Sequence, residues 1–387
     1  MTEKLYDMDP HIAEFEATVL SCEKTEDETY AVILDRTAFF PEEGGQGCDE
    51  GMLANQKILH VAIDKENVLT HFLTSPLTVG DTVTGKLNYS LRFDRMQQHT
   101  GEHILSGLIH NRFGFHNVGF HLSNDYTTFD TSGTLSDEEI RTLEADANKV
   151  VFSNLKVRAF YPEKEELEAL SYRSKMEIDG PVRLVEIPGI DLCACCAPHV
   201  DYTGQIGMIK IVDYKNHRGG MRLTILCGMR ALAYSTANER TLSYLSRELS
   251  VPFEKIEEAF CRLKEETLSK QSRINELQEK LLQCRIASLP SPSESNRAIL
   301  FVDSMDMKAV RNIVNHLTES YRDYCAIFSG SDECGYNFII GAGCEGDCNP
   351  LSLRLREIVF AKCGGNAKMI QGSVNASKDR ILEIFKI

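Results

Sequence analysis

Two short segments about a hundred residues apart each place metal-binding side-chain types four residues apart. In the first, His99 and His103 lie in a stretch with helical hydrophobic spacing, so both imidazoles should leave one helix face about one turn apart. In the second, Cys195 and His199 have the same spacing. A chain that uses all four side chains together must fold so that the two segments meet.

Imidazole nitrogen and thiolate are the ligands that borderline-soft Zn²⁺ prefers, and four of them complete a tetrahedral set. We therefore expect one zinc ion to be bound by His99, His103, Cys195 and His199. A simpler interpretation stays open, in which the cysteines from Cys193 to Cys196 are small buried hydrophobic residues.

A protease motif is a second alternative for the first segment. The run from His99 to His103 matches the H-x-x-E-H pattern of a class of zinc proteases, in which Glu102 would be the base that activates a metal-bound water. That interpretation requires a carboxylate as the third ligand. It gives no role to Cys195 and His199.

Length and composition predict a cytoplasmic protein of several domains. The chain has 387 residues, which corresponds to about two to four domains. It contains no apolar run long enough to span a membrane, and its polar, acidic start is unlike a secretory signal. The 13 cysteines are scattered, which is typical of free thiols rather than of a secreted disulfide scaffold.

The charge distribution limits how the chain could bind nucleic acid. A formal net charge of -15 argues against extensive non-specific binding of nucleic acid, because neutralising phosphates requires Lys and Arg. Residues 208–222 and the tail from Phe360 onward are locally basic. A solvated charged surface explains both runs as well as a binding face does.

Hydrophobic patterns predict four regions of an α+β protein. Residues 1–88 carry short alternating segments with Gly and Pro turns, which predict a small β-barrel. Residues 89–228 mix helical and strand patterns and should form the zinc-binding core. Residues 229–287 have apolar residues at heptad spacing, which predict a coiled-coil arm or, equally, a long amphipathic helix. Residues 288–387 have the strand–helix–strand rhythm of a small α/β domain.

Local signals predict where several elements begin and end. Gly114 should end the helix that carries the histidine pair, and Ser136 with Glu139 should form a capping box at the start of the next helix. Residues 205–212 have the pattern of a strand, and Ser250 should be the N-cap of the long helix in the third region.

The two zinc motifs resemble those of AlaX-type alanyl-tRNA editing proteins, which are similar to the editing half of alanyl-tRNA synthetase. The family core reads R-M-x-x-H-T-x-x-H followed by C-x-x-x-H-V-x-x-T-G-x-I-G, and this chain matches at residues 95–103 and 195–207. Residues 34–46 resemble the family's glycine-rich segment, and residues 219–223 resemble the strand after the zinc motif. Residues 363–372 resemble the glycine-rich end of the DHH-associated C-terminal domain.

The chain departs from the family pattern at two places. Residues 196–198 read Cys-Ala-Pro where Gly-Gly-Thr is usual, and Glu43 stands where a third glycine is common. The chain shows no D-H-H triplet and no class II aminoacylation domain before the barrel, so the resemblance predicts editing without aminoacylation.

The resemblance implies hydrolysis of the ester that joins a wrong amino acid, most often serine, to alanine-specific tRNA. The catalytic candidates are Thr100, Glu102, His116 and His121, with Thr100 as a contact for the serine hydroxyl or simply a helix-packing residue. The substrate-binding candidates are Asp35, Thr37, Gly44, Gly45, Gln46, Gln98 and Arg222. The tRNA-binding candidates are Lys210, Lys215, Arg218 and Lys368.

A function of a different class stays open: a zinc-stabilised tRNA-binding module without turnover. A site with four protein ligands is closed, as structural zinc sites are. In an enzyme the zinc would either activate water or the ester, or position the substrate. The helical arm or the C-terminal domain is expected to bind tRNA or to join two copies of the chain as a homodimer.

Overall fold

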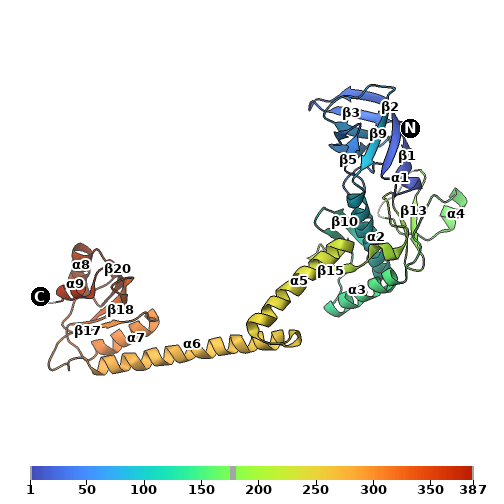
Figure 1. Ribbon diagram of the computed structural model, residues 1–387. Coiled ribbons are helices and arrows are strands. Elements are labelled where there is room, and N and C mark those ends of the chain that lie inside the picture. The colour runs from blue at the N-terminus through green and yellow to red at the C-terminus, as the bar shows by residue number, and fades with distance from the viewer. Residues whose placement is uncertain (1, 175–179, 386–387) are drawn as a thin grey trace. The chain divides into compact units, whose positions relative to one another are not determined.

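The computed structural model describes residues 2–174 and 180–385, and the chain divides into two compact units, Met1–Tyr244 and Leu245–Ile387. Over these described residues it is a mixed α+β protein with nine α-helices, which confirms the predicted class (Figure 1). The finer division into four domains stays a prediction. No described helix combines the length and the apolar character needed to cross a membrane.

The first unit begins with a seven-stranded sheet in the order β6-β5-β9-β2-β3-β8-β7. Its strands are β2 (Glu14–Lys24), β3 (Tyr30–Leu34), β5 (Gly51–Leu53), β6 (Gln56–Lys57), β7 (His60–Ile63), β8 (Leu69–Leu73) and β9 (Thr82–Leu87). The long strand β2 pairs with both β3 and β9, so it joins the two halves of the sheet around one apolar core. A short helix α1 (Leu5–Met8) and a parallel pair, β1 (Glu3–Lys4) and β4 (Arg36–Thr37), complete this part. Closure of the sheet into a barrel stays a prediction.

Helix α2 (Tyr89–Phe113) forms the centre of the first unit. Asn88 caps its start, and Gly114 ends it with a left-handed φ of 70°, as predicted. Helix α3 (Asp137–Phe152) begins with the predicted capping box of Ser136 and Glu139. Both helices pack on one apolar core with a four-stranded antiparallel sheet of β10 (Asn117–Leu122), β11 (Thr127–Thr131), β16 (Gly220–Cys227) and β15 (Ile209–His217).

A second, three-stranded sheet supports the other side of α2. It consists of β12 (Arg158–Phe160), β13 (Leu184–Ile187) and β14 (Asp191–Ala194), and β14 lies against α2. The short helix α4 (Lys164–Ala169) lies between β12 and β13 in the chain. The predicted strand over residues 205–212 begins later than expected, because residues 203–206 form a 3₁₀ turn and Gly207 has a φ of 79°. Strand β15 therefore starts only at Ile209.

Helix α5 (Gly228–Leu249) contains the boundary between the units. Ser250 does not cap the next helix as predicted. Its backbone N–H donates to Arg247 O, and its φ of 52° is the left-handed conformation that ends α5. Helix α6 (Ile256–Ala287) begins six residues later, after a 3₁₀ turn at Phe253–Lys255.

The second unit contains a five-stranded sheet in the order β17-β18-β19-β21-β20. The strands are β17 (Ala298–Val302), β18 (Tyr324–Ser331), β19 (Gly335–Ala342), β20 (Lys362–Gly365) and β21 (Met369–Val374). Helix α7 (Met307–Thr318) connects the parallel strands β17 and β18, which matches the predicted strand–helix–strand rhythm. In β18, Cys325 and Ile327 pack with α6 and α7, whereas Ala326 and Phe328 pack with α8 (Cys348–Val359) and α9 (Lys378–Glu383).

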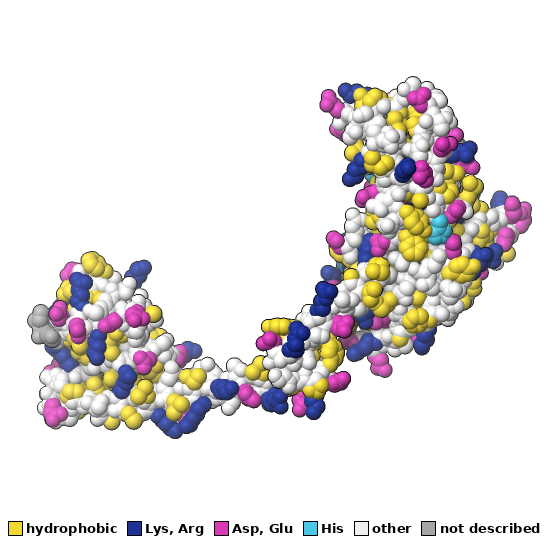
Figure 2. Space-filling model, viewed as in Figure 1, with side chains coloured by type: hydrophobic (Ala, Val, Ile, Leu, Met, Phe, Trp, Pro, Cys, Tyr) yellow, Lys and Arg dark blue, Asp and Glu magenta, His cyan; other side chains and the backbone are white. Residues whose placement is uncertain are grey.

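The predicted heptad residues of α6 are half-exposed. Phe260, Leu263, Ile274, Leu277 and Leu281 keep 48% to 60% of their surface exposed within the chain. Charged side chains of both signs lie along this helix on the face shown in Figure 2. The coiled-coil arm stays a prediction.

A buried ion pair joins the N-terminal sheet to α2. The guanidinium of Arg92 donates from Nε to both carboxylate oxygens of Asp49, at 3.0 and 3.1 Å, and from its other nitrogens to the carbonyl oxygens of Pro10 and Ala38. Arg92 and Asp49 are both almost completely buried. Removal of one partner would leave an uncompensated charge in the interior.

We therefore expect Arg92→Met to lower the free energy of unfolding of the first unit by about 3–5 kcal/mol. Urea denaturation of the full chain, followed through the transition of the first unit, measures this loss. The matched control is Arg36→Met, because Arg36 forms a half-exposed ion pair with Glu3 at 3.4 Å. The control should change the same quantity by less than about 1 kcal/mol, and equal losses in the two variants would contradict the role of the buried pair.

Candidate metal centre

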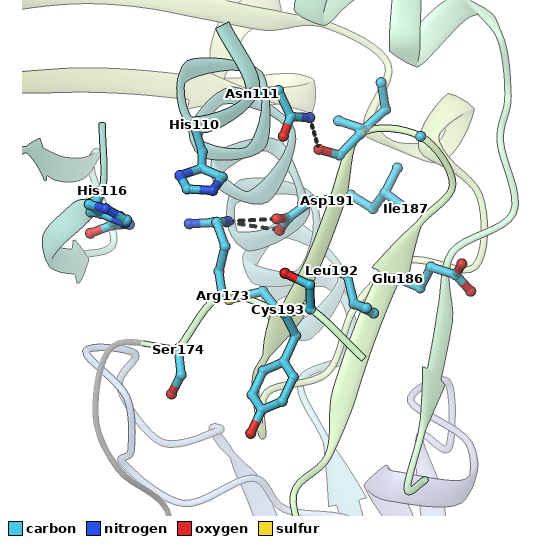
Figure 3. Close-up of a pocket in the computed structure, with 15 residues that line it drawn as sticks. His110, Asn111, His116, Arg173, Ser174, Glu186, Ile187, Asp191, Leu192 and Cys193 are labelled. Carbon is cyan, nitrogen blue, oxygen red and sulfur yellow. Dashed lines mark hydrogen bonds and ion pairs between the residues drawn. The ribbon is translucent and has the colours of Figure 1, made fainter. Parts of the chain in front are cut away.

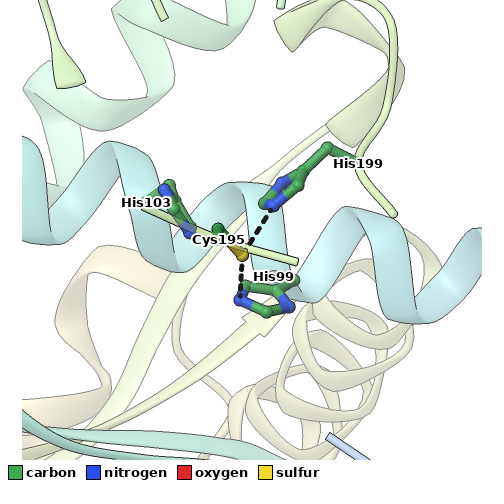
Figure 4. Close-up of side chains that lie close together, drawn as sticks. All are labelled: His99, His103, Cys195 and His199. Atoms are coloured by element: carbon green, nitrogen blue, oxygen red, sulfur yellow. Dashed lines mark hydrogen bonds between the residues drawn. The ribbon is translucent and has the colours of Figure 1, made fainter. Parts of the chain in front are cut away.

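Four side chains from the two distant segments meet in the first unit (Figure 4). Helix α2 presents His99 and His103 from one face, and the loop after β14 supplies Cys195 and His199. One nitrogen or sulfur atom from each of the four lies within 4.8 Å of the corresponding atoms of the others. The thiol sulfur of Cys195 lies 3.3 Å from His199 Nε2 and 3.7 Å from His99 Nε2.

The donor set fits a tetrahedral zinc ion. Ligand bonds of about 2.0–2.1 Å to nitrogen and 2.3 Å to sulfur place tetrahedral donors about 3.3–3.6 Å apart. The sulfur–nitrogen distances of 3.3 and 3.7 Å are close to this spacing. All four residues are buried or nearly so, which restricts water.

Each imidazole of the cluster is oriented through its other nitrogen. The Nδ1 atom of His99 lies 3.0 Å from Gln46 Oε1, that of His103 lies 2.9 Å from Asp191 Oδ2, and that of His199 lies 3.0 Å from Thr100 Oγ1. A proton on each Nδ1 satisfies these oxygens and leaves the opposite nitrogen as an acceptor towards the cluster. Metal-binding histidines are typically held in this way.

Burial and the charges of the cluster shift the pKa values of Cys195, His103 and His199. Burial raises the pKa of the Cys195 thiol, but the charges of His99 and His199 and hydrogen bonds from His103 and His199 outweigh burial, so the net pKa lies well below its usual value. Burial lowers the pKa of His103, yet its hydrogen bonds to Asp191 and Cys195 raise the net pKa well above normal. Burial lowers the pKa of His199 to about 3. The cluster therefore favours a thiolate and a neutral His199, both of which are competent metal ligands.

Asp191 and Arg173 are parts of the site that sequence reasoning missed. Asp191 is buried, and it accepts hydrogen bonds from His103 and, at 2.7 and 2.9 Å, from Arg173 Nε and Nη2. Burial raises the pKa of the Asp191 carboxyl, but the hydrogen bonds from His103 and Arg173 lower it overall. One sequence signal existed: Asp191 and Cys193 alternate along an extended segment, so they share one face.

A cavity of about 510 Å³ adjoins this Asp191–Arg173 pair (Figure 3). The end of α2 contributes His110 and Asn111, the start of β10 contributes Asn117, and the hairpin of β13 and β14 forms another wall. The candidate His116 lines this cavity, and its ring lies 5.1 Å from that of His110. The cavity and the donor cluster are therefore linked through Asp191, which contacts His103 and lines the cavity.

The remaining catalytic candidates lie at different distances from the cluster. Thr100 is fully buried and contacts it directly through His199, and its hydroxyl also accepts from Val200 N at 3.3 Å. Glu102 is buried on α2, and its carboxylate accepts a hydrogen bond from Asn117 at 2.5 Å. His121 is exposed on β10.

The structure brings only part of the substrate-binding set to the cluster. The loop with Gly44, Gly45 and Gln46 reaches it, through Gln46 on His99 and Gly44 beside Cys196. The other members bond elsewhere: Asp35 to Thr18 N, Thr37 to His71, Gln98 to the backbone of Cys227, and Arg222 to Asp130.

The tRNA-binding candidates are distributed over both units. Lys210 forms an ion pair with Glu144 at 2.6 Å. Lys215 and Arg218 are exposed at the hairpin of β15 and β16, and Lys368 is exposed between β20 and β21.

Comparison with known families matches two parts of the chain. The model of the threonyl and alanyl tRNA synthetase second additional domain matches residues 182–223, which include Cys195 and His199. The model of class II (A) tRNA synthetases matches residues 6–91.

Curated relatives match over longer stretches. The alanyl-tRNA editing protein AlaX-L of Pyrococcus horikoshii is 26% identical over 407 residues, an alignment that covers 99% of this chain and 97% of that protein. The alanine–tRNA ligase of Ignicoccus hospitalis is 30% identical over 293 residues, which cover 73% of this chain and 32% of the ligase. That of Pyrococcus abyssi is 28% identical over 407 residues, which cover 100% of this chain and 44% of the ligase. The chain thus spans less than half the length of these two ligases.

The likeness to an editing protein extends over nearly the full length of both chains, and the matched residues include the segment that completes the donor cluster. These comparisons support an AlaX-type alanyl-tRNA editing protein.

Proposed function

We propose that this chain is a zinc-dependent hydrolase of the cytoplasm that removes serine from wrongly charged alanine tRNA. The observation that carries the proposal is the convergence of three imidazoles and one thiol, with every imidazole oriented through its Nδ1. A bound Zn²⁺ would supply Lewis acidity towards the ester or a more acidic water.

Thr100 supports discrimination between serine and alanine. Its oxygen accepts from His199 Nδ1–H and from Val200 N–H, which uses both acceptor positions of the hydroxyl. The hydroxyl proton is then left to donate to the side-chain oxygen of serine. A site built to bond a hydroxyl rejects the analogue that lacks it, because its own polar group stays unpaired.

Two alternatives make different predictions for the same cluster. A zinc-stabilised tRNA-binding module would bind tRNA but leave the ester intact in a single-turnover assay. A protease of the H-x-x-E-H type would need Glu102 as its base, so Glu102→Gln would abolish all activity. The presence of Cys195 and His199 beside the histidine pair favours the editing chemistry over the protease.

The exposed Lys215, Arg218 and Lys368 support contact with the tRNA backbone, because exposed cations neutralise phosphates. We further propose that α6 and the C-terminal sheet bind tRNA or join two copies of the chain. A chain that ends at residue 249 lacks both α6 and the C-terminal sheet, and it should then bind tRNA more weakly or lose dimer mass in light scattering. Unchanged affinity and unchanged mass would contradict both roles.

Replacement of the thiolate tests the proposed activity. We expect Cys195→Ala to abolish deacylation of seryl-tRNA and to reduce bound zinc, because the cluster loses its only sulfur donor. Single-turnover hydrolysis and metal analysis measure the two effects. The control Cys261→Ala removes an exposed thiol of α6 and should change neither. Full activity of a chelator-treated, metal-free wild-type protein would remove the proposal.

Replacement of Asp191 tests how the cluster is oriented. Asp191→Ala removes the acceptor of His103 Nδ1–H, so zinc affinity should fall by about 10–100-fold. Competition with a metal indicator measures this affinity. The control Asp130→Ala removes a carboxylate that pairs with Arg222 away from the cluster. Equal zinc affinity in wild type and Asp191→Ala would show that the carboxylate does not support the metal site.

A further inference from the structure

The loop at residues 43–46 is held firmly against the core of the first unit. Leu122 N on β10 donates to Gly45 O at 2.9 Å, and Gln46 forms a bridge with Leu122. Gly45 has a φ of 86°, and a Cβ atom there would lie 2.4 Å from Phe120 O, so only glycine permits this approach. The ring of Phe120 in turn stacks on His99 with centroids 4.6 Å apart. The loop therefore holds Gln46 in a fixed position beside the donor cluster.

The Gln46 side chain has two different ends at this position. It is 1% exposed, and its Oε1 lies 3.0 Å from His99 Nδ1. When His99 binds metal through Nε2, its Nδ1 carries the proton, so Gln46 must present oxygen rather than nitrogen to it. The amide group cannot flip without losing this bond, and the position of its Nε2 is thereby set.

The Nε2 atom of Gln46 has no hydrogen-bond partner anywhere in residues 2–174 and 180–385. A buried amide N–H without a partner is costly, and such groups in native proteins require an explanation. Here the unpaired donor belongs to the same planar group that orients a proposed metal ligand. That arrangement resembles a preorganised donor for a substrate oxygen.

We propose that Gln46 Nε2 donates a hydrogen bond to the carbonyl oxygen of the aminoacyl ester while Gln46 Oε1 orients His99, an inference that rests on the function proposed above. In the hydrolysis, a water oxygen bonds to the ester carbon, and an electron pair moves onto the carbonyl oxygen. That pair then reforms the carbonyl as the bond to the ribose oxygen breaks, and the ribose oxygen takes a proton from the water. The Gln46 N–H stabilises the charge that develops on the carbonyl oxygen between these steps.

Two substitutions separate the two ends of the amide. Gln46→Glu keeps an oxygen acceptor for His99 but removes both N–H donors. Gln46→Met removes acceptor and donors at similar length. The matched control is Gln56→Glu on β6, where the side-chain oxygen accepts from Ser75 N at 3.0 Å. Zinc affinity, seryl-tRNA hydrolysis at saturating zinc, and binding of an adenosine that carries serine through a stable 3′-amide are measured for each full-length protein.

We expect Gln46→Met to lose about 10–100-fold in zinc affinity and Gln46→Glu to keep it within a few-fold. At saturating zinc, both variants should lose about 100–1,000-fold in kcat with little change in KM, because the donor acts mainly on the transition state. Both should bind the 3′-amide analogue within a few-fold of wild type, because this analogue mimics the ground state and not the transition state. The Gln56→Glu control should match wild type in every measurement.

A wild-type kcat in either Gln46 variant at saturating zinc would overturn the donor role. A loss of zinc affinity in Gln46→Glu would not change that conclusion, because kcat is measured at saturating zinc. Wild-type zinc affinity in Gln46→Met would overturn the orienting role. A wild-type protein that binds zinc and yet fails to hydrolyse seryl-tRNA would instead remove the proposed function and the donor role with it. The zinc titration of Gln46→Met would still decide the orienting role by itself.

Discussion

The close packing of α2 against its neighbours is the constraint on which the site depends. Most of its residues from Arg92 to Ile109 are buried, although the helix carries many polar side chains. Two glycines make the packing possible. A Cβ at Gly101 would lie 2.3 Å from Cys227 Sγ, and a Cβ at Gly107 would lie 2.6 Å from Ile190 O. Glycine in a helix costs about 1 kcal/mol relative to alanine, and here that cost allows β16 and the β13–β14 hairpin to approach α2 closely.

Three parts of the first unit contribute to the cluster. Helix α2 supplies two histidines, the loop after β14 supplies Cys195 and His199, and the loop before β5 supplies Gln46. The Arg92–Asp49 pair fixes the N-terminal sheet to the same helix. Because the orienting groups come from different segments, the geometry of the donors depends on the packing of the whole unit rather than on any one motif.

The sequence predicts local features of this arrangement well. Helical spacing places His99 and His103 on one face, and the signals at Gly114 and Ser136 mark element ends where the structure has them. The sequence predicts less about features that depend on tertiary contacts. Ser250 has the composition of an N-cap, yet its backbone closes the preceding helix, because capping requires an extended φ and ψ that no local pattern guarantees. Asp191 could be found only by assuming that its strand lies beside α2.

The orientation of the three histidines makes the centre of the cluster a favourable position for a cation. With each Nδ1 proton committed to Gln46, Asp191 or Thr100, the opposite nitrogens present lone pairs towards the thiol of Cys195. Lone pairs that converge in a buried space repel one another unless a positive charge lies among them. A proton can supply part of that charge: burial lowers the pKa of His103, but its hydrogen bonds to Asp191 and to Cys195 raise the net pKa, and the pKa of Cys195 is lowered. A divalent ion supplies it to all four donors at once, and metal binding must therefore displace protons from the cluster.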